Sequence, residues 1–309
     1  MSQNIFKNPE HQRLFNRQGF IVLPLLDIDT VNKLNLVFDN LHQNLPAKGF
    51  MTSGYSKDYN YKLNSSNSII ELLAPKIKMI LDNFQTIGAS FSYKLPSPES
   101  DFNLHQDWTV VDEKNDISVN VWIPLCDTNI ENGTLFVLPG SHYANFPVHR
   151  SPTIGYVYNT KEKEEVVKQK LIPISVKAGT AVIINHSLIH YSPPNLSKNV
   201  RKAIIAGYTN KGAQMYFYYK KPNKNIVDIY KITNDFYNRF TDFHKQVYDN
   251  PEYAEYEKSI KYKLPNLNIK DLEDLTNEML VNAGYEAKYS NVNIPLLDKI
   301  ISRFKFTRF

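Results

Sequence analysis

Residues 177–208 read KAGTAVIINHSLIHYSPPNLSKNVRKAIIAGY, and this stretch carries the strongest signal for a β-structured domain. Two apolar runs, TAVIIN and RKAIIAGY, each have the length of a strand, and a connection rich in histidine and proline joins them. β-Branched residues favour the extended chain, whereas glycine and proline mark its ends. We therefore predict two strands here, with polar side chains near their ends.

Earlier segments of the chain repeat this pattern. Short apolar runs bounded by turn residues lie at 87–95, 117–125, 133–139 and 171–178. Several short strands at this spacing are typical of a β-sandwich or barrel. The sequence therefore predicts a mainly β fold with flanking helices.

The segments before these strands favour helices and one loop. Residues 11–18 predict a helix that Gly19 ends, because glycine commonly terminates helices, and the strand 20–26 follows. A second helix is expected with Asp29 as its N-cap, since apolar residues then recur at spacings of three and four. Residues 45–66 are polar, rich in tyrosine and interrupted by glycine, which predicts a loop near the mouth of a site.

The composition changes toward Tyr, Lys, Asn and Asp beyond about Gly212. Amphipathic helices are predicted at 234–249 and 269–284. We therefore expect residues 1–212 to form the β domain with its N-terminal helices. Residues 213–309 are expected to form a helical C-terminal extension packed on the barrel.

The composition also excludes several classes of protein. The 309 residues contain 36 Lys and Arg against 31 Asp and Glu, and the basic residues are scattered, which argues against a nucleic-acid partner. The single cysteine, Cys126, excludes an intramolecular disulfide framework. No run reaches the roughly 18 apolar residues of a membrane-spanning helix, and no apolar segment of signal-peptide length opens the chain. We expect a cytoplasmic protein without an integral membrane segment.

A candidate metal site begins in the segment NLHQDWTV. In an extended chain residues i and i+2 point to the same side, so His105 and Asp107 can bind one ion. For the third ligand, His186 and His190 both qualify, since each follows the strand TAVIIN closely. Two histidines and one carboxylate leave positions on Fe(II) open for a co-substrate and O2. Arg201, which opens the next strand, suits a two-point pair with a co-substrate carboxylate.

Four blocks resemble the phytanoyl-CoA dioxygenase family in order and spacing. They are HQD at 105–107, NVWIPL at 120–125, ENGTLFVLPGSH at 131–142 and the block at 177–203, and the likeness runs from about Phe15 to Tyr208. The resemblance implies a double-stranded β-helix, the cupin-like jelly roll, with iron at one mouth of the barrel. It also implies that Fe(II), 2-oxoglutarate as co-substrate, and O2 are used at this site.

The resemblance further assigns roles to individual residues. In the family the third ligand lies eleven residues before the arginine that holds 2-oxoglutarate, and His190 and Arg201 have this spacing. The implied metal ligands, which are also the implied catalytic residues, are His105, Asp107 and His190. The implied co-substrate residues are Arg201, Ser192, Trp122 and Thr134, whereas His142 of PGSH is implied to support a turn of the fold.

The expected activity is that of a 2-oxoglutarate-dependent dioxygenase, a hydroxylase that oxidises an unactivated C–H bond and releases succinate and CO2. Asp107 disfavours halogenation, because related halogenases replace this carboxylate with a small residue. The expected substrate is a small molecule, such as an acyl, amino-acid or natural-product intermediate, free or tethered to CoA or a carrier. The alternative is a non-catalytic jelly roll that binds a ligand or a metal, and the sequence leaves the oligomeric state open.

Two regions are expected to select the substrate. One is the loop 48–61, with Tyr55, Tyr59 and Tyr61, because aromatic loop residues suit a pocket with an apolar body. The other is the insert 149–167 between two of the predicted strands.

Overall fold

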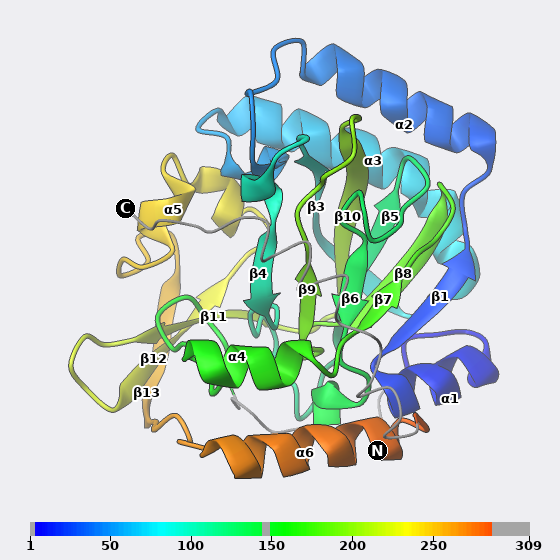
Figure 1. Cartoon of the computed structure of the whole chain (residues 1–309). Helices are drawn as coiled ribbons and strands as arrows, with labels where there is room; N and C mark the ends of the chain where they lie inside the picture. The colour runs from blue at the N-terminus through cyan, green and yellow to red at the C-terminus, as the bar shows by residue number, and fades with distance from the viewer. Residues whose placement is uncertain (1–3, 144–148, 286–309) are drawn as a thin grey trace.

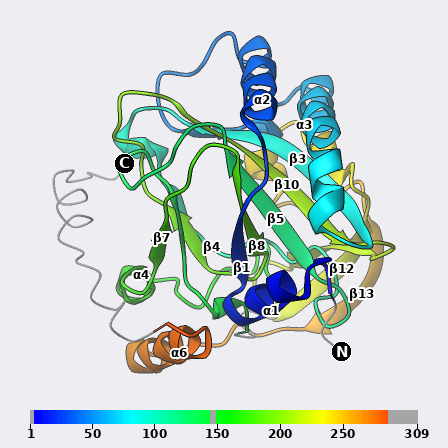
Figure 2. The same cartoon turned by 90° about the vertical axis from the view of Figure 1, so that its right-hand side faces the viewer.

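The computed structural model describes residues 4–143 and 149–285, and this part of the chain forms two facing β-sheets flanked by helices (Figures 1 and 2). The larger sheet has six antiparallel strands in the order β1-β8-β5-β10-β3-β2. They are β1 (Phe20–Pro24), β2 (Phe50–Thr52), β3 (Phe84–Lys94), β5 (Ser118–Pro124), β8 (Thr180–Asn185) and β10 (Arg201–Asn210).

The smaller sheet has four antiparallel strands in the order β4-β9-β6-β7. They are β4 (Phe102–His105), β6 (Leu135–Val137), β7 (Ile172–Ile174) and β9 (His190–Ser192). Strands β4 and β9 are short and were not predicted from the sequence. Both carry candidate ligands, so the site lies mainly on the smaller sheet.

The two sheets pack face to face through one apolar cluster. Trp122 and Val182 of the larger sheet pack with Leu135 and Val137 of the smaller one. Phe136 points to the opposite face, because side chains alternate along a strand, and it joins a second cluster outside the smaller sheet. This arrangement confirms the predicted mainly β, jelly-roll fold.

Three helices precede or interrupt the larger sheet in the chain. They are α1 (Pro9–Gln18), α2 (Ile28–Leu41) and α3 (Tyr59–Ile80). Leu34 of α2 and Leu73 of α3 are fully buried in a cluster that includes Phe91 of β3. Figure 2 shows α2 and α3 on the outer side of the larger sheet, so this sheet is buried on both faces.

Two predictions for the N-terminal region were wrong. The N-cap of α2 is Asp27 rather than Asp29, because the Asp27 carboxylate accepts a hydrogen bond from the Thr30 amide at 2.8 Å. The predicted loop 45–66 ends early, since α3 begins at Tyr59 with Asp58 as its N-cap. The polar first turns of α3 concealed the helix, whose later residues supply the buried apolar face.

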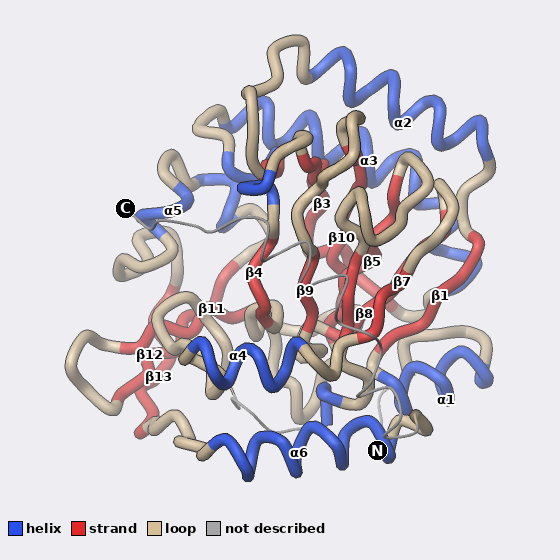
Figure 3. Tube along the Cα trace, in the orientation of Figure 1, coloured by secondary structure: helices blue, strands red, loops and turns tan. Residues whose placement is uncertain are grey.

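The C-terminal extension is only partly helical, which corrects the prediction. It contains a three-stranded antiparallel sheet of β11 (Met215–Lys220), β12 (Ile226–Ile232) and β13 (Glu255–Lys261). These strands are labelled and coloured red in Figure 3. The helix predicted at 234–249 is replaced by two short turns of helix, η4 (Phe236–Arg239) and α5 (Phe243–Gln246). Aromatic residues here pack on β11 and β12 instead of forming one continuous helical face.

The predicted helix 269–284 is present as α6 (Ile269–Asn282). Its Leu272 and Leu280 are buried in the cluster of Phe136, outside the smaller sheet. Residues 286–309 of the predicted extension lie outside the described residues.

The remaining helices are short. They are η1 (Ser53–Tyr55), η2 (Pro98–Ser100), η3 (Ser141–Tyr143) and α4 (Lys161–Lys168). Among the helices of the described ranges, none is both long and apolar enough to cross a membrane.

Candidate metal centre and its cavity

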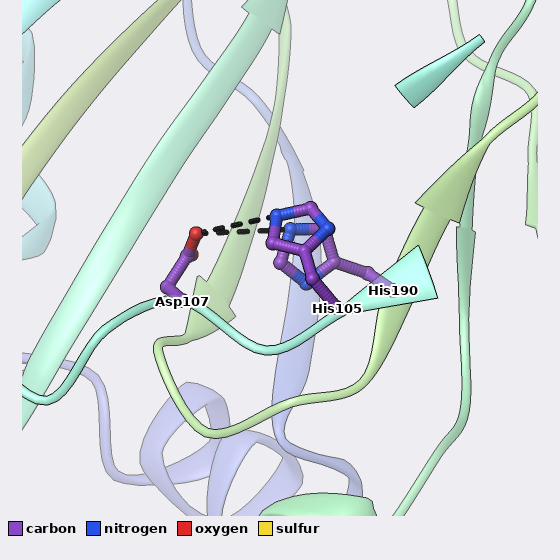
Figure 4. A group of neighbouring side chains, drawn as sticks. All are labelled: His105, Asp107 and His190. Carbon is purple, nitrogen blue, oxygen red and sulfur yellow. Dashed lines mark ion pairs between the residues drawn. The ribbon is translucent and has the colours of Figure 1, made fainter. Parts of the chain in front are cut away.

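Three side chains from two segments of the chain converge at the end of the smaller sheet (Figure 4). His105 ends β4, His190 opens β9, and the two residues are paired across these strands. Asp107 lies in the loop after β4, so the predicted approach of His105 and Asp107 is present although only His105 is in the strand. The Nε2 atoms of His105 and His190 lie 3.6 Å and 3.9 Å from Asp107 Oδ1. One ligand atom from each residue lies within 4.8 Å of the others, close enough to hold one metal ion.

The two imidazole rings are oriented by the backbone. His105 Nδ1 lies 2.7 Å from the Asn103 carbonyl, and His190 Nδ1 lies 2.9 Å from the Leu188 carbonyl. A carbonyl only accepts, so each Nδ1 donates to the backbone and each Nε2 is left facing Asp107. Burial, reinforced by the neighbouring His105, lowers the pKa of His190 to about 4. The His190 ring is therefore neutral near pH 7, the form that binds a metal.

The Asp107 carboxylate is fixed from the other side. Its Oδ2 accepts a hydrogen bond from Asn120 Nδ2 at 2.7 Å, which leaves Oδ1 facing the histidines. Burial alone would raise the pKa of Asp107, but His190 and His105 outweigh it and hold the pKa well below its usual range. The group is ionised near pH 7, as a metal ligand must be. Asn120 was missed from the sequence, although it lies two residues before Trp122 and hence on the same face of β5.

A cavity of about 200 Å³ adjoins these three residues. Its walls come from both sheets and from the segment 50–55, and the lining is mostly apolar or uncharged. The lining residues are Phe50, Thr52, Tyr55, Ser90, Ser92, Phe102, His105, Asp107, Asn120, Trp122, Leu135, Ile184, His190, Ser192, Arg201 and Ile205. Of the predicted co-substrate residues, Arg201, Ser192 and Trp122 are therefore brought together with the three candidate ligands.

Arg201 brings a buried positive charge to this cavity. Only 3% of the residue is exposed, and its Nε and Nη1 have no hydrogen-bond partner. Its guanidinium lies over the Trp122 ring at 5.6 Å, a cation–π contact. Burial lowers the pKa of Arg201 to about 10, so the group is still charged near pH 7. A buried charge without a partner is costly, and a carboxylate in the cavity would supply that partner.

Ser192 lines the cavity next to a buried lysine. The Ser192 hydroxyl donates to the Gly133 carbonyl at 2.9 Å, and Lys94 Nζ donates to the Ser192 carbonyl at 2.7 Å. Lys94 is fully buried and is the cross-strand neighbour of Arg201. Lys94 therefore fixes the backbone of β9 at Ser192, a residue that lines the cavity.

Thr134 is not brought to the cavity, which corrects the prediction for this residue. It is fully buried, and its hydroxyl donates to the Ile174 carbonyl at 2.5 Å across β6 and β7. Thr134 thus supports the smaller sheet.

The other two candidate histidines also lie outside the cavity lining. His186 is buried, and neither ring nitrogen has a hydrogen-bond partner. Burial lowers the pKa of His186, which keeps the ring neutral. His142 Nε2 lies 2.8 Å from the Asn16 carbonyl, so this histidine connects the turn after β6 to α1.

Of the two regions expected to select the substrate, only the first contributes to the lining. Tyr55 lines the cavity, whereas Tyr59 and Tyr61 lie in α3, and the Tyr61 hydroxyl instead contacts His42. The insert 149–167 supplies no lining residue, and it packs behind the loop that carries Asp107.

Arg150 of this insert holds that loop through its backbone. Arg150 is 2% exposed, and its Nε donates to the Asp107 carbonyl at 2.8 Å. Its two terminal nitrogens bind Glu113, one of them at 2.9 Å. In addition, the Tyr156 hydroxyl donates to the Gln106 carbonyl at 3.0 Å. No pattern in the sequence connects these residues, because their partners lie about 40 or more positions away along the chain.

Replacing Arg150 with methionine is expected to weaken Fe(II) binding by about 10- to 100-fold, the range typical of groups that orient a metal ligand. The change removes the hydrogen bond to the Asp107 backbone and leaves Glu113 without its partner. Competition with a fluorescent chelator measures the affinity. The matched control is Arg13→Met, which removes an exposed arginine paired with Glu10. Equal Fe(II) affinity in Arg150→Met and Arg13→Met would contradict this role.

Comparison with known proteins agrees with the resemblance predicted from the sequence. Residues 68–203 match the family model described as phytanoyl-CoA dioxygenase, and this range contains His105, Asp107, His190 and Arg201. The resemblance to the phytanoyl-CoA dioxygenase family is thereby confirmed for this part of the chain.

Curated relatives match over part of their length. A phytanoyl-CoA dioxygenase domain-containing protein 1 homolog of Dictyostelium discoideum is 28% identical over 121 residues, or 38% of this chain and 43% of the relative. A probable alpha-ketoglutarate-dependent hypophosphite dioxygenase of Stutzerimonas stutzeri is 28% identical over 149 residues, or 46% of this chain and 50% of the relative. The chain thus spans half or less of the length of these relatives.

Among solved structures, similarity is found to the non-heme alpha ketoglutarate dependent carbocyclase SnoK from nogalamycin biosynthesis. The sequence identity is 16% and the TM-score 0.49, with 67% of this chain and 86% of that chain covered. HygX from Streptomyces hygroscopicus, crystallised with nickel, 2-oxoglutarate and hygromycin B, is also 16% identical, with a TM-score of 0.49 and 66% and 88% of the two chains covered.

Proposed function

We propose that this protein is an Fe(II)- and 2-oxoglutarate-dependent dioxygenase. One observation carries the proposal: three ligand atoms, two imidazole nitrogens and one carboxylate oxygen, meet at a cavity that also contains an unpartnered guanidinium. The candidate metal ligands and Arg201 thus line the same cavity. The family match over residues 68–203 supports the same conclusion.

His105, Asp107 and His190 are the proposed Fe(II) ligands and the catalytic residues. Two neutral histidines and one carboxylate are the donor set of the non-haem Fe(II) oxygenases, and they leave positions open for other ligands. The hydrogen bonds to both Nδ1 atoms and to Asp107 Oδ2 already fix the donor atoms. When bound, the iron supplies the oxidation chemistry, in which 2-oxoglutarate and O2 are converted to succinate and CO2 with one oxygen atom entering the substrate.

Arg201 is the proposed anchor for the distal carboxylate of 2-oxoglutarate. Its Nε and Nη1 have no hydrogen-bond partner, so the guanidinium has donors free for a carboxylate. Trp122 supports the guanidinium from one face, and both residues line the cavity. Ser192 is proposed to add its hydroxyl to the same carboxylate, which requires the proton to turn away from the Gly133 carbonyl.

The proposed reaction is hydroxylation of an unactivated C–H bond in a small or carrier- or CoA-tethered metabolite. The cavity of about 200 Å³ is smaller than the roughly 300–1,000 Å³ of typical ligand pockets, and 2-oxoglutarate must share it. Only the reacting end of a substrate therefore fits beside the co-substrate. We assign this activity to residues 1–212 and treat residues 213–309 as an extension of that domain.

An anaerobic titration of the Fe(II)-loaded protein with 2-oxoglutarate tests the proposal. Chelation of Fe(II) by the keto-acid end of 2-oxoglutarate gives a visible charge-transfer absorption band, and we expect this band to appear and saturate. If Fe(II) binds with no band at saturating 2-oxoglutarate, the dioxygenase proposal fails. The protein would then be a jelly roll that binds a metal or another ligand without this co-substrate.

A further inference from the structure

The C-terminal extension reaches the cavity through one aromatic contact. Tyr55 of η1 lines the cavity, and its ring centroid lies 4.9 Å from that of Phe243 in α5. The neighbouring His244 ring lies 4.5 Å from Tyr55. Residues of the extension therefore form the layer directly behind one wall of the cavity.

Phe243 also reaches the loop that carries a proposed iron ligand. Its ring is stacked on that of Trp108, with centroids 5.8 Å apart and an interplanar angle of 12°. Trp108 directly follows Asp107 in the chain. The Phe243 ring therefore contacts both Tyr55, which lines the cavity, and Trp108, which follows the proposed ligand Asp107.

The segment that carries Phe243 is fixed at several points. The Tyr59 hydroxyl donates to Asp235 at 3.0 Å, and Lys62 Nζ donates to the Phe240 carbonyl. Lys62 is 3% exposed, and burial lowers its pKa, so its hydrogen bond to a carbonyl replaces hydration that the ammonium has lost. Figure 1 shows α5 at the end of the molecule where α3 begins, in agreement with these contacts. The position of Phe243 is therefore set by α3 as well as by the extension.

The wall that Phe243 supports is aromatic and uncharged. Phe50 lies 4.4 Å from Phe102 and 6.4 Å from Tyr55 by ring centroids, and all three line the cavity. Among the described lining residues, the only charged or readily ionised groups are Arg201 and the three candidate ligands, apart from the Tyr55 hydroxyl. A charged substituent placed against this wall would lose hydration without gaining a partner.

We propose that Phe243 is a specificity-determining residue of this site. By holding Tyr55 in place, Phe243 limits the size of the group that lies beside the co-substrate, and the aromatic wall selects an uncharged, apolar group. Phe243 acts through Tyr55 and is therefore a positioning residue. This inference rests on the proposed dioxygenase function and gives the C-terminal extension its role in that function.

The test uses analogues of 2-oxoglutarate that differ only in bulk and charge. N-Oxalylglycine retains the chelating end and the distal carboxylate, and N-oxalylphenylalanine, in both enantiomers, adds a benzyl group. N-Oxalylglutamate, also in both enantiomers, adds a charged side chain. Each analogue displaces 2-oxoglutarate from the Fe(II)-loaded protein, and loss of the charge-transfer band measures its affinity. The variants are Phe243→Ala, the ring-retaining Phe243→Tyr, and Tyr248→Ala, an exposed aromatic residue of the same segment.

In Phe243→Ala, we expect the affinity for at least one enantiomer of N-oxalylphenylalanine to rise about tenfold relative to N-oxalylglycine, because Tyr55 gains space to move. N-Oxalylglutamate is expected to show no such gain. Phe243→Tyr and Tyr248→Ala are expected to keep the wild-type ratios, so a general loss of stability cannot produce the result.

Two results would overturn the inference while leaving the dioxygenase function intact. One is an unchanged ratio in Phe243→Ala, and the other is an equal gain for N-oxalylglutamate. Absence of the charge-transfer band in the wild-type protein with Fe(II) bound would instead overturn the dioxygenase function itself. Because Phe243 is only partly buried, the alanine variant is expected to fold, which circular dichroism checks.

Discussion

Alanine at position 190 is expected to reduce Fe(II) affinity by more than about 100-fold, since removing a ligand costs at least as much as removing a group that orients one. Within residues 4–143 and 149–285, His190 belongs to the group of three candidate metal ligands, and its Nε2 is already turned toward Asp107. Asp107→Ala is expected to have a comparable effect and to abolish turnover. Chelator competition under anaerobic conditions measures the affinity, and succinate release in air measures the turnover.

His186→Ala is the matched control for His190→Ala. His186 is the other buried histidine of the same connection, but it does not line the cavity. We expect this variant to keep Fe(II) affinity within a few-fold of the wild-type value. Retention of iron by His190→Ala together with its loss in His186→Ala would exchange the two roles.

Leucine at position 201 is expected to weaken 2-oxoglutarate binding by about 100-fold or more, since hydrogen bonds to charged groups contribute about 1.5–3 kcal/mol each and Arg201 offers two. Fe(II) affinity is expected to stay near the wild-type value, because Arg201 is not among the three grouped ligands. The charge-transfer titration measures 2-oxoglutarate binding, and chelator competition measures the iron.

Lys202→Leu is the control for Arg201→Leu, because it removes a cation from the next residue of β10. Lys202 binds Asp39 at 2.6 Å, away from the cavity, so 2-oxoglutarate affinity is expected to be unchanged. Equal affinity in Arg201→Leu and the wild-type protein would contradict the assignment of Arg201. The dioxygenase proposal would then need another anchor for the co-substrate.

Most strands of the barrel could be predicted because each is a run of apolar residues between turn residues. Strands β5 and β8 are buried by both sheet packing and helices, so their sequences are almost continuously apolar. The start of α3 could not be predicted in this way, because its first turns are polar and its stability depends on packing against β3. The C-terminal strands β11 and β12 were not predicted, because aromatic residues occur in both helices and strands. The sequence alone therefore did not distinguish the two kinds of element.

Some residues of the candidate site could likewise be predicted from the sequence, whereas others could not. His105, Asp107, His190 and Arg201 are close in the structure, and their spacing within recognisable blocks made them predictable. Thr134 was misplaced because its block forms a turn whose hydroxyl is used by the neighbouring strand. Contacts such as that of Arg150 with the Asp107 backbone depend on folding and leave no periodic pattern in the chain.

The pairing of His105 with His190 has a consequence for folding. Strand β4 has four residues, lies at the edge of its sheet and has an irregular register with β9, so few backbone hydrogen bonds hold it there. A metal ion bound by both histidines would join these two strands as a cross-link between β4 and β9. Because a metal that binds only the folded state stabilises that state, bound Fe(II) would then stabilise the pairing of β4 with β9 in addition to its proposed part in catalysis.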